Sequence, residues 1–198
     1  MFFDKSSKQA FVFPPKVGTI TTCHFLGSIG WKGLHPRHQK THEWIEKYPS
    51  LNDYSFYGFF RDPMKRFESA LLHIKQFPIT KGFFVKFLKS KGIDKNEETV
   101  TYEELCSVHS DLLIYFPRVF IPQSEWFFHP KVTLLDFDNF ESELRRITGN
   151  AEQPLVRWNT STDFGRSVIT DKVRAFVREY YAADYALAKD RLGKTYEG

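Results

Sequence analysis

Residues 54–69 of the chain, YSFYGFFRDPMKRFES, contain its clearest structural pattern. The first seven, Tyr54–Phe60, form a continuous run rich in aromatic residues, which is typical of a strand buried on both faces. Asp62 can then cap a helix and Pro63 can occupy its first position, so we expect a helix that extends to about Ile74. The stretch therefore predicts a strand that runs directly into a helix.

The same pattern occurs twice more. The apolar run Ala10–Phe13 precedes a tight loop and a helix predicted at Ile20–Ile29. The strand predicted at Lys131–Asp136 precedes a helix predicted at Phe140–Ile147. Strands that alternate with helices imply a parallel sheet covered on both faces. We therefore predict a single α/β domain over residues 1–198, with three α/β/α layers around a central parallel sheet. The other predicted elements are a helix capped by Thr41 that ends near Pro49, short helices at Phe83–Leu88 and Tyr102–Val108, a polar loop at Gly149–Gly165 and a final helix at about Thr170–Leu192.

The composition is that of one globular domain. Of the 198 residues, 41% are hydrophobic and 21 are Phe, so the chain can bury a sufficient core without disulfides. Cys23 and Cys106 lie far apart and neither belongs to a C-x-x-C pair, which favours a reducing, cytoplasmic location. The chain has no run of ~20 apolar residues and its net charge is only +4, so we expect a soluble protein without a membrane or nucleic-acid partner.

Residues 16–22, between the first strand and its helix, carry the donor groups of an anion site. Gly18 permits a sharp turn, N–H groups at a helix start point at one spot, and Lys16 adds a positive charge. Thr19, Thr21 and Thr22 add hydroxyl donors. The loop is not a Walker A motif, and the only G-K-[ST] sequence, at residues 193–195, lacks the first glycine of that motif. An ordinary capped turn is the alternative interpretation.

A second group of candidate anion ligands follows the aromatic strand. Arg61 offers a planar fork for an oxyanion, and Ser69 adds a hydroxyl on the following helix. Because the carboxyl ends of parallel strands meet at one edge of a sheet, we expect this junction to lie beside residues 16–22. Two anion sites on one edge indicate a nucleotide with phosphates at two positions. A surface salt bridge to Asp62 or Glu68 is the alternative for Arg61.

Three of the seven histidines, His35, His38 and His42, fall within eight positions. Transfer of a group to a hydroxyl needs a base that titrates near neutrality, as imidazole does. A zinc site is the competing interpretation, but Pro36 interrupts a regular helix and the neighbouring basic residues oppose a cation. A solvated His-rich loop is the third interpretation. We expect no metal site.

Two of these motifs resemble elements of a known family. Residues 15–19, Pro-Lys-Val-Gly-Thr, resemble the 5′-phosphosulfate loop of sulfotransferases that use 3′-phosphoadenosine 5′-phosphosulfate (PAPS). Residues 61–69 resemble the R-[DN]-P-x-x-R-x-x-S element of the same enzymes. The chain is most similar to the carbohydrate sulfotransferase group, although Ile20 interrupts its run of hydroxyl residues. Further matching elements occur in the expected order at Pro122-Gln123, Val132–Phe137, Asn159-Thr160-Ser161 and Asp184-Tyr185.

The resemblance implies a P-loop-like, sulfotransferase-like α/β fold and an enzyme that moves a sulfuryl group from PAPS to an acceptor hydroxyl without a metal. It implies that Lys16 stabilises the departing 5′-phosphate of the product, 3′-phosphoadenosine 5′-phosphate (PAP). It favours His38 as the base, with His35 and His42 as alternatives, and a carbohydrate or other small molecule as acceptor. A small nucleotide-dependent kinase and a catalytically inactive nucleotide-binding domain are the alternative functions. The implied nucleotide contacts are Lys16, Val17, Gly18, Thr19, Ile20, Thr21, Thr22, Arg61, Ser69 and, in the polar loop, Asn159.

Overall fold

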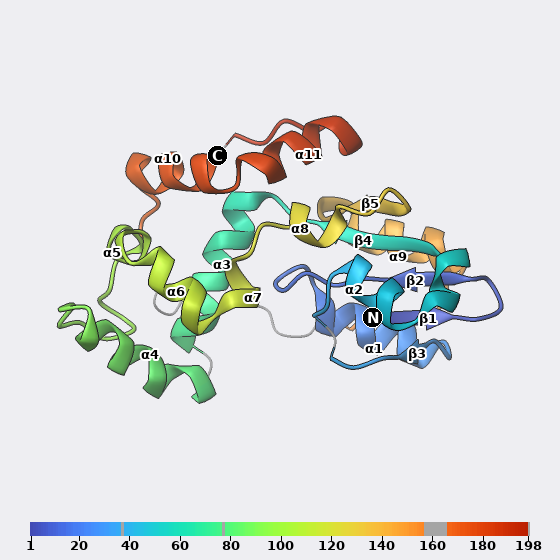
Figure 1. Ribbon diagram of the computed structural model, residues 1–198, viewed down its shortest axis with the longest axis horizontal. Coiled ribbons are helices and arrows are strands. Elements are labelled where there is room, and N and C mark those ends of the chain that lie inside the picture. The colour runs from blue at the N-terminus through green and yellow to red at the C-terminus, as the bar shows by residue number, and fades with distance from the viewer. Residues whose placement is uncertain (37, 77, 157–165, 198) are drawn as a thin grey trace.

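A five-stranded mixed sheet with helices on both faces forms one part of the molecule (Figure 1). This computed structural model describes residues 1–36, 38–76, 78–156 and 166–197, with the backbone alone for residues 78–81. The strand order is β3-β1-β2-β4-β5. The strands are β1 (Phe2–Asp4), β2 (Gln9–Phe11), β3 (Lys32–Gly33), β4 (Ser55–Phe60) and β5 (Val132–Asp136).

The three strands predicted from the sequence form the parallel part of the sheet. β4 pairs in parallel with β2 on one side, where Phe11 lies opposite Tyr57, and with β5 on the other, where Phe60 lies opposite Asp136. The carboxyl ends of β2, β4 and β5 therefore meet at one edge of the sheet.

The prediction of a wholly parallel sheet is wrong for the remaining strands. β1 pairs antiparallel with both β2 and β3. Between β1 and β2 the chain reverses over residues 5–8, where the Asp4 carboxylate accepts hydrogen bonds from Ser6 and Ser7 and Lys8 has a φ of 50°. So short a connection can join only antiparallel strands. β3 consists of two exposed residues, so no hydrophobic pattern marks it in the sequence.

Helices cover both faces of the sheet and form a second part of the molecule beside it (Figure 1). α10 contacts α3 and α5 in the helical part, whereas α11 contacts α8 and β5 beside the sheet, so this helix pair spans both parts. The helices are α1 (Thr19–Ser28), α2 (Thr41–Lys47), α3 (Pro63–Gln76), α4 (Pro78–Ser90), α5 (Tyr102–Ser107), α6 (His109–Tyr115), α7 (Pro117–Phe120), α8 (Ser124–Phe127), α9 (Phe140–Thr148), α10 (Asp171–Tyr180) and α11 (Ala182–Leu192), with 3-10 turns η1 (Pro49–Asp53) and η2 (Phe137–Asn139).

Alternate side chains of β4 enter two different hydrophobic cores. Phe56 and Phe60 pack with α2, α8 and α11 on one face, whereas Phe59 packs with α1 and α9 on the other. A Cβ atom at Gly58 would overlap the Phe127 ring, so glycine at this position lets α8 pack directly on the strand. A third core lies among α3 to α7 and α10. These contacts explain why β4 carries aromatic side chains on both of its faces.

Three local predictions had different outcomes. The Asp62 cap is confirmed, because Asp62 Oδ1 accepts a hydrogen bond of 2.8 Å from the Lys65 N–H. The cap predicted at Thr41 is wrong: Lys40 holds that position, and the Thr41 hydroxyl donates to the Trp126 carbonyl at 2.8 Å. The predicted final helix is two helices, separated at Tyr181, whose buried hydroxyl donates to the Phe120 carbonyl at 2.8 Å.

Within the described ranges, no helix has the length and apolar character needed to cross a membrane. Both cysteines are free thiols; Cys23 is buried and Cys106 is half-buried.

Candidate functional site

The two predicted anion junctions lie side by side at the carboxyl edge of the parallel strands. Lys16 follows β2 and Arg61 follows β4, and the Arg61 guanidinium donates a hydrogen bond of 3.0 Å from Nη1 to the Lys16 carbonyl. The guanidinium also lies over the Phe137 ring, 5.2 Å from its centroid, where Phe137 follows β5. All three parallel strands thus contribute to one site.

The loop before α1 has a backbone suited to an anion. Lys16 and Gly18 both adopt positive φ angles, 70° and 72°, in the left-handed region. A Cβ at Gly18 would lie 3.0 Å from the rings of Phe137 and Phe140, so both the backbone conformation and the space favour glycine here. The first bond within α1 runs from the Thr22 N–H to the Gly18 carbonyl, so the earlier N–H groups precede the helical bonding pattern and face outward from the helix start.

Two cations, Lys16 of this loop and Arg61 after β4, lie together. The nearby carboxylates of Glu68, Asp62 and Asp138 partly offset the charge of Arg61. Burial and the neighbouring Arg61 charge lower the pKa of Lys16 to about 8. Among the described residues, Lys16 Nζ has no ion-pair or hydrogen-bond partner. Nε of Arg61 is buried, and none of the residues that the structure describes accepts a hydrogen bond from it. A buried N–H without an acceptor beside an uncompensated ammonium is the chemistry of an anion site.

Two of the threonine hydroxyls predicted to bind the anion have backbone partners. Thr19 Oγ1 donates to the Pro14 carbonyl at 3.2 Å, and Thr22 Oγ1 donates to the Gly18 carbonyl at 3.1 Å. Thr21 is buried, Ile20 is half-buried, and Val17 belongs to the core beneath the sheet. The donors that this loop offers are therefore the backbone N–H groups and Lys16, rather than the hydroxyls of Thr19 and Thr22.

Helix α3 supports the loop from the opposite side. Arg66 is buried, and its Nε donates to the Pro15 carbonyl at 3.1 Å while Nη2 donates to the Val119 carbonyl at 3.1 Å. Ser69 is also buried and lies three residues further along α3, on the face that carries Arg66. Arg66 is therefore a structural residue of the motif, and Ser69 lies near the loop that Arg66 holds.

The salt bridge considered for Arg61 is not formed with either neighbouring carboxylate in the described residues. Asp62 caps α3, and Glu68 forms an ion pair with Arg166 at 3.4 Å. The guanidinium instead bonds to Lys16. This arrangement leaves the positive charge of Arg61 at the sheet edge.

His38 is the histidine of the cluster that contacts the strand edge. Its Nδ1 lies 2.9 Å from the Phe13 carbonyl, which can only accept, so Nδ1 carries the proton in the neutral ring. Nε2 is then the basic nitrogen, the form that a general base requires. The ring also packs edge-on against Trp126 at 6.4 Å between centroids, and Arg118 donates to the His38 carbonyl.

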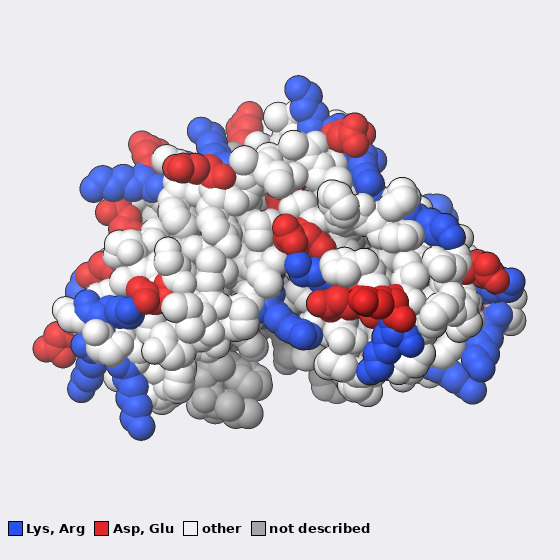
Figure 2. All heavy atoms as spheres, in the orientation of Figure 1, with Lys and Arg blue, Asp and Glu red and all other residues white. Residues whose placement is uncertain are grey.

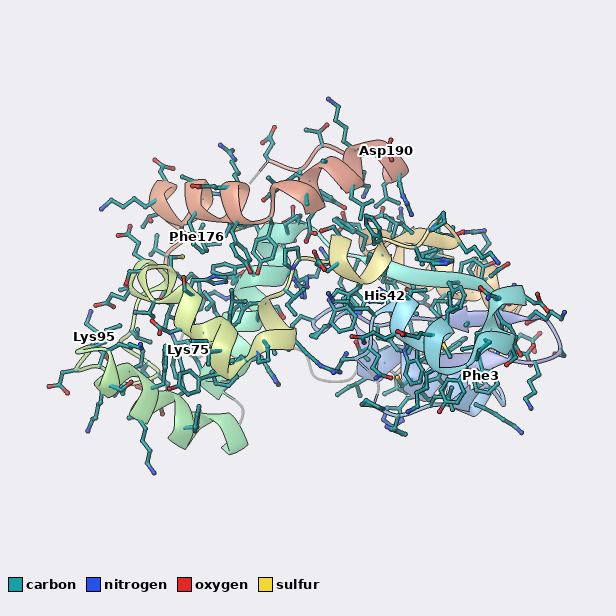
Figure 3. All side chains as sticks on the ribbon, viewed as in Figure 1. Phe3, His42, Lys75, Lys95, Phe176 and Asp190 are labelled. Carbon is teal, nitrogen blue, oxygen red and sulfur yellow. The ribbon has the colours of Figure 1, made fainter. Side chains whose placement is uncertain are left out.

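His35 and His42 differ from His38 in exposure. Both side chains are exposed, whereas His38 is half-buried, and His42 lies on α2 beside the sheet (Figure 3). No group of three metal-ligating side chains suited to a metal ion is found in the ranges that the structure covers. Asn159, the remaining predicted nucleotide contact, lies outside the described residues.

The sequence interpretation missed His73. This residue follows Ser69 by four positions on α3, so it continues the face formed by Arg66 and Ser69. Burial, together with the charges of Lys16 and His38, lowers the pKa of His73 to about 4. A neutral imidazole therefore lies close to both groups at pH 7. The spacing of residues 66, 69 and 73 is the signal that could have identified it.

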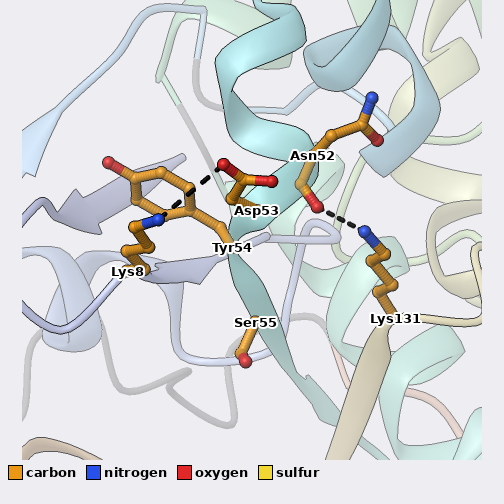
Figure 4. Close-up of a pocket in the computed structure, with 6 residues that line it drawn as sticks. All are labelled: Lys8, Asn52, Asp53, Tyr54, Ser55 and Lys131. Carbon is orange, nitrogen blue, oxygen red and sulfur yellow. Dashed lines mark hydrogen bonds and ion pairs between the residues drawn. The ribbon is translucent and has the colours of Figure 1, made fainter.

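The charge of the site is local. On the face shown in Figure 2, Lys and Arg side chains are interspersed with Asp and Glu side chains. An open pocket lies at the amino ends of β2, β4 and β5, lined by Lys8, Asn52, Asp53, Tyr54, Ser55 and Lys131 (Figure 4). There Lys8 pairs with Asp53 at 3.7 Å and Lys131 donates to the Asn52 carbonyl. Its lysines therefore have partners, whereas the Lys16 ammonium at the opposite edge has none within the ranges that the structure describes.

Comparisons with protein-family models, with curated proteins and with solved structures gave no match to this chain. The functional inference therefore rests on the groups of the site itself: two neighbouring cations, the start of α1 and the His38 ring.

Proposed function

We propose that the protein is a sulfotransferase that moves a sulfuryl group from PAPS to an acceptor hydroxyl, with a carbohydrate-type acceptor favoured by the family resemblance. One observation carries the proposal: Lys16 and Arg61 meet at the carboxyl edge of the sheet, with a buried guanidinium nitrogen that lacks an acceptor. Anions at this edge are the common ligands of α/β sheets. The sulfotransferase-like fold is part of the same proposal.

The two junctions suit the two ends of the donor. The N–H groups at the start of α1 and the Lys16 ammonium would hold the 5′-phosphosulfate. Arg61 and Ser69 would hold the 3′-phosphate. Because the Arg61 guanidinium bonds to the Lys16 carbonyl, the two anion-binding groups have a fixed separation, which would fix the position of the donor.

Bound PAPS would supply the sulfuryl group: a bond forms between acceptor oxygen and sulfur, the bond from sulfur to the 5′-phosphate oxygen breaks, and PAP leaves. Nε2 of His38 would take the acceptor's hydroxyl proton, because the Phe13 carbonyl holds the other proton on Nδ1. Lys16 would balance the charge that develops on the 5′-phosphate. The nearby His73 is neutral at pH 7, so it would add no positive charge to the anion site.

The kinase alternative finds less support in the site. Gly193 ends α11 instead of starting a helix, and Lys194 Nζ lies 2.5 Å from Asp136 Oδ2 and 3.1 Å from Asp138 Oδ2. The lysine of the G-K-[ST] sequence at residues 193–195 is thus paired with carboxylates. In a phosphate-binding loop the lysine instead contacts the phosphates of the nucleotide.

Calorimetric titration with PAP, ADP and AMP tests the proposal. We expect PAP to bind at least tenfold more tightly than AMP, since each charge-assisted contact to the 3′-phosphate contributes about 1.5–3 kcal/mol. Preference for ADP over PAP would favour the kinase. Tight PAP binding without sulfuryl transfer to any hydroxyl acceptor would favour the inactive nucleotide-binding domain.

A further inference from the structure

The backbone pairing between β4 and β5 ends at Phe60, and at the next residue, Arg61, a side chain supplies the hydrogen-bond partners of the backbone. Gln123 Oε1 accepts a hydrogen bond of 3.0 Å from the Arg61 N–H, and Gln123 Nε2 donates one of 2.8 Å to the Arg61 carbonyl. Both backbone polar groups of Arg61 are therefore satisfied by one amide. Since the Arg61 side chain starts from this backbone, its direction depends on Gln123.

Gln123 is itself fixed by a carboxylate from the last helix. Asp184 of α11 is fully buried; its Oδ2 accepts from the Gln123 N–H at 2.8 Å and its Oδ1 accepts from the Ser124 N–H at 2.7 Å. The Gln123 amide nitrogen lies 3.4 Å from the same Oδ2. Burying a carboxylate costs free energy of desolvation, and hydrogen bonds from N–H donors to both of its oxygens offset that cost only in a narrow range of geometries. It determines the position of Gln123.

The segment Arg118–Ser124 touches both halves of the candidate site. Its first residue donates to the His38 carbonyl, and Gln123 near its other end holds Arg61. Between them, the Val119 carbonyl accepts from Arg66. The segment thus connects the proposed base, the loop support on α3 and the proposed phosphate ligand.

We infer that Gln123 and Asp184 are positioning residues, which aim Arg61 at the bound anion and set its place relative to His38. The inference rests on the proposed function for the identity of the nucleotide, but not for the anion site itself. Neither residue contacts the anion: Gln123 acts through the Arg61 backbone and Asp184 acts through Gln123.

A double-mutant cycle tests this role. Gln123→Met keeps the approximate shape and adds no charge, and we expect it to weaken PAP binding roughly tenfold in the wild-type background, the size of one lost contact to a charged group. In an Arg61→Ala background the same change should alter the Kd by less than about twofold, because the residue that it aims is gone. Equal losses in both backgrounds, or no loss in either, would overturn the inference.

Tyr181→Phe is the matched control, since it removes a buried hydrogen bond to Phe120 in the same segment but none to Arg61. It should lower the unfolding midpoint and leave the Kd for PAP unchanged. If Tyr181→Phe and Gln123→Met both weaken PAP binding in proportion to their loss of stability, the inference is contradicted. If Gln123→Met does not fold, Asp184→Asn keeps the shape of the carboxylate and should give the same cycle.

Pyrophosphate separates this inference from the proposed function. A wild-type protein that binds pyrophosphate at the site of Lys16 and Arg61 but does not prefer PAP would contradict the sulfotransferase proposal, and the cycle would then be measured with pyrophosphate. Binding of neither ligand contradicts both.

Discussion

Deprotonation of Lys16 should weaken anion binding near pH 8, well below the pH at which an ordinary lysine side chain loses its proton. With a pKa of about 8, roughly nine-tenths of Lys16 is protonated at pH 7 and roughly one-tenth at pH 9. If only the ammonium form binds the 5′-phosphate, the affinity for PAP falls about tenfold between these values. The phosphates of the ligand are almost fully ionised throughout this range, since their second pKa is about 6.

The unfolding free energy should move in the opposite direction. The unfolded chain keeps this proton up to pH about 10.5, whereas the folded protein releases it near pH 8, so the stability of the ligand-free protein rises with pH between the two values. Lys75 is also buried and its pKa is likewise lowered to about 8, so it contributes to the same rise in stability. The pH dependence of affinity is therefore the observation that identifies Lys16.

Titration calorimetry with PAP at pH 7, 8 and 9 measures the effect, with urea unfolding at the same pH values for stability. Lys16→Met should bind PAP weakly and lose the pH dependence. Lys65→Met is the control, because Lys65 is an exposed cation at the start of α3, paired with Asp138 at 3.9 Å, and its removal should leave the dependence unchanged. A flat affinity in the wild type from pH 7 to 9, or an unaltered slope in Lys16→Met, would refute the assignment of Lys16 to the anion.

Three substitutions test the rest of the site. Arg61→Ala should weaken PAP by roughly ten- to a hundredfold and AMP far less, measured by calorimetry; equal losses would separate Arg61 from the 3′-phosphate. His38→Ala should lower kcat by about 10²- to 10⁴-fold in a sulfuryl-transfer assay with little change in PAP affinity, whereas the exposed His35 and His42 should tolerate alanine; a kcat loss at one of these instead would move the base there. Gly18→Ala should lower the unfolding free energy by about 1–3 kcal/mol in urea, because its φ of 72° and the nearby rings both oppose a Cβ; wild-type stability would contradict this account.

The parallel part of the fold could be predicted because its signals are local. The aromatic run of β4, the Asp62 cap and the Pro63 helix start lie within ten residues of one another. Two such junctions are enough to predict that Lys16 and Arg61 lie together, because the carboxyl ends of parallel strands meet at one edge of the sheet. The hydrogen bond from the Arg61 guanidinium to the Lys16 carbonyl agrees with that expectation.

The rest depends on contacts between distant residues, which no local pattern records. The antiparallel strand β1 has three residues, too few for a hydrophobic period. Tyr181 interrupts an amphipathic run because its hydroxyl reaches Phe120, 61 residues away. The threonines of the loop look like ligands in sequence, but Thr19 and Thr22 bond to backbone carbonyls once the turn has formed.

The bond between Asp184 and Gln123 also orders events during synthesis. A ribosome adds about 5–20 residues per second, so β4 and Arg61 emerge several seconds before α11 does. Until α11 has been made, Gln123 lacks its hydrogen bond to Asp184. The edge of the sheet can then form before the direction of the Arg61 side chain is fixed. A nascent chain stalled before α11 should therefore contain every proposed ligand and still bind the nucleotide more weakly than the complete chain. Nucleotide capture on stalled ribosomes would then report the arrival of the last helix.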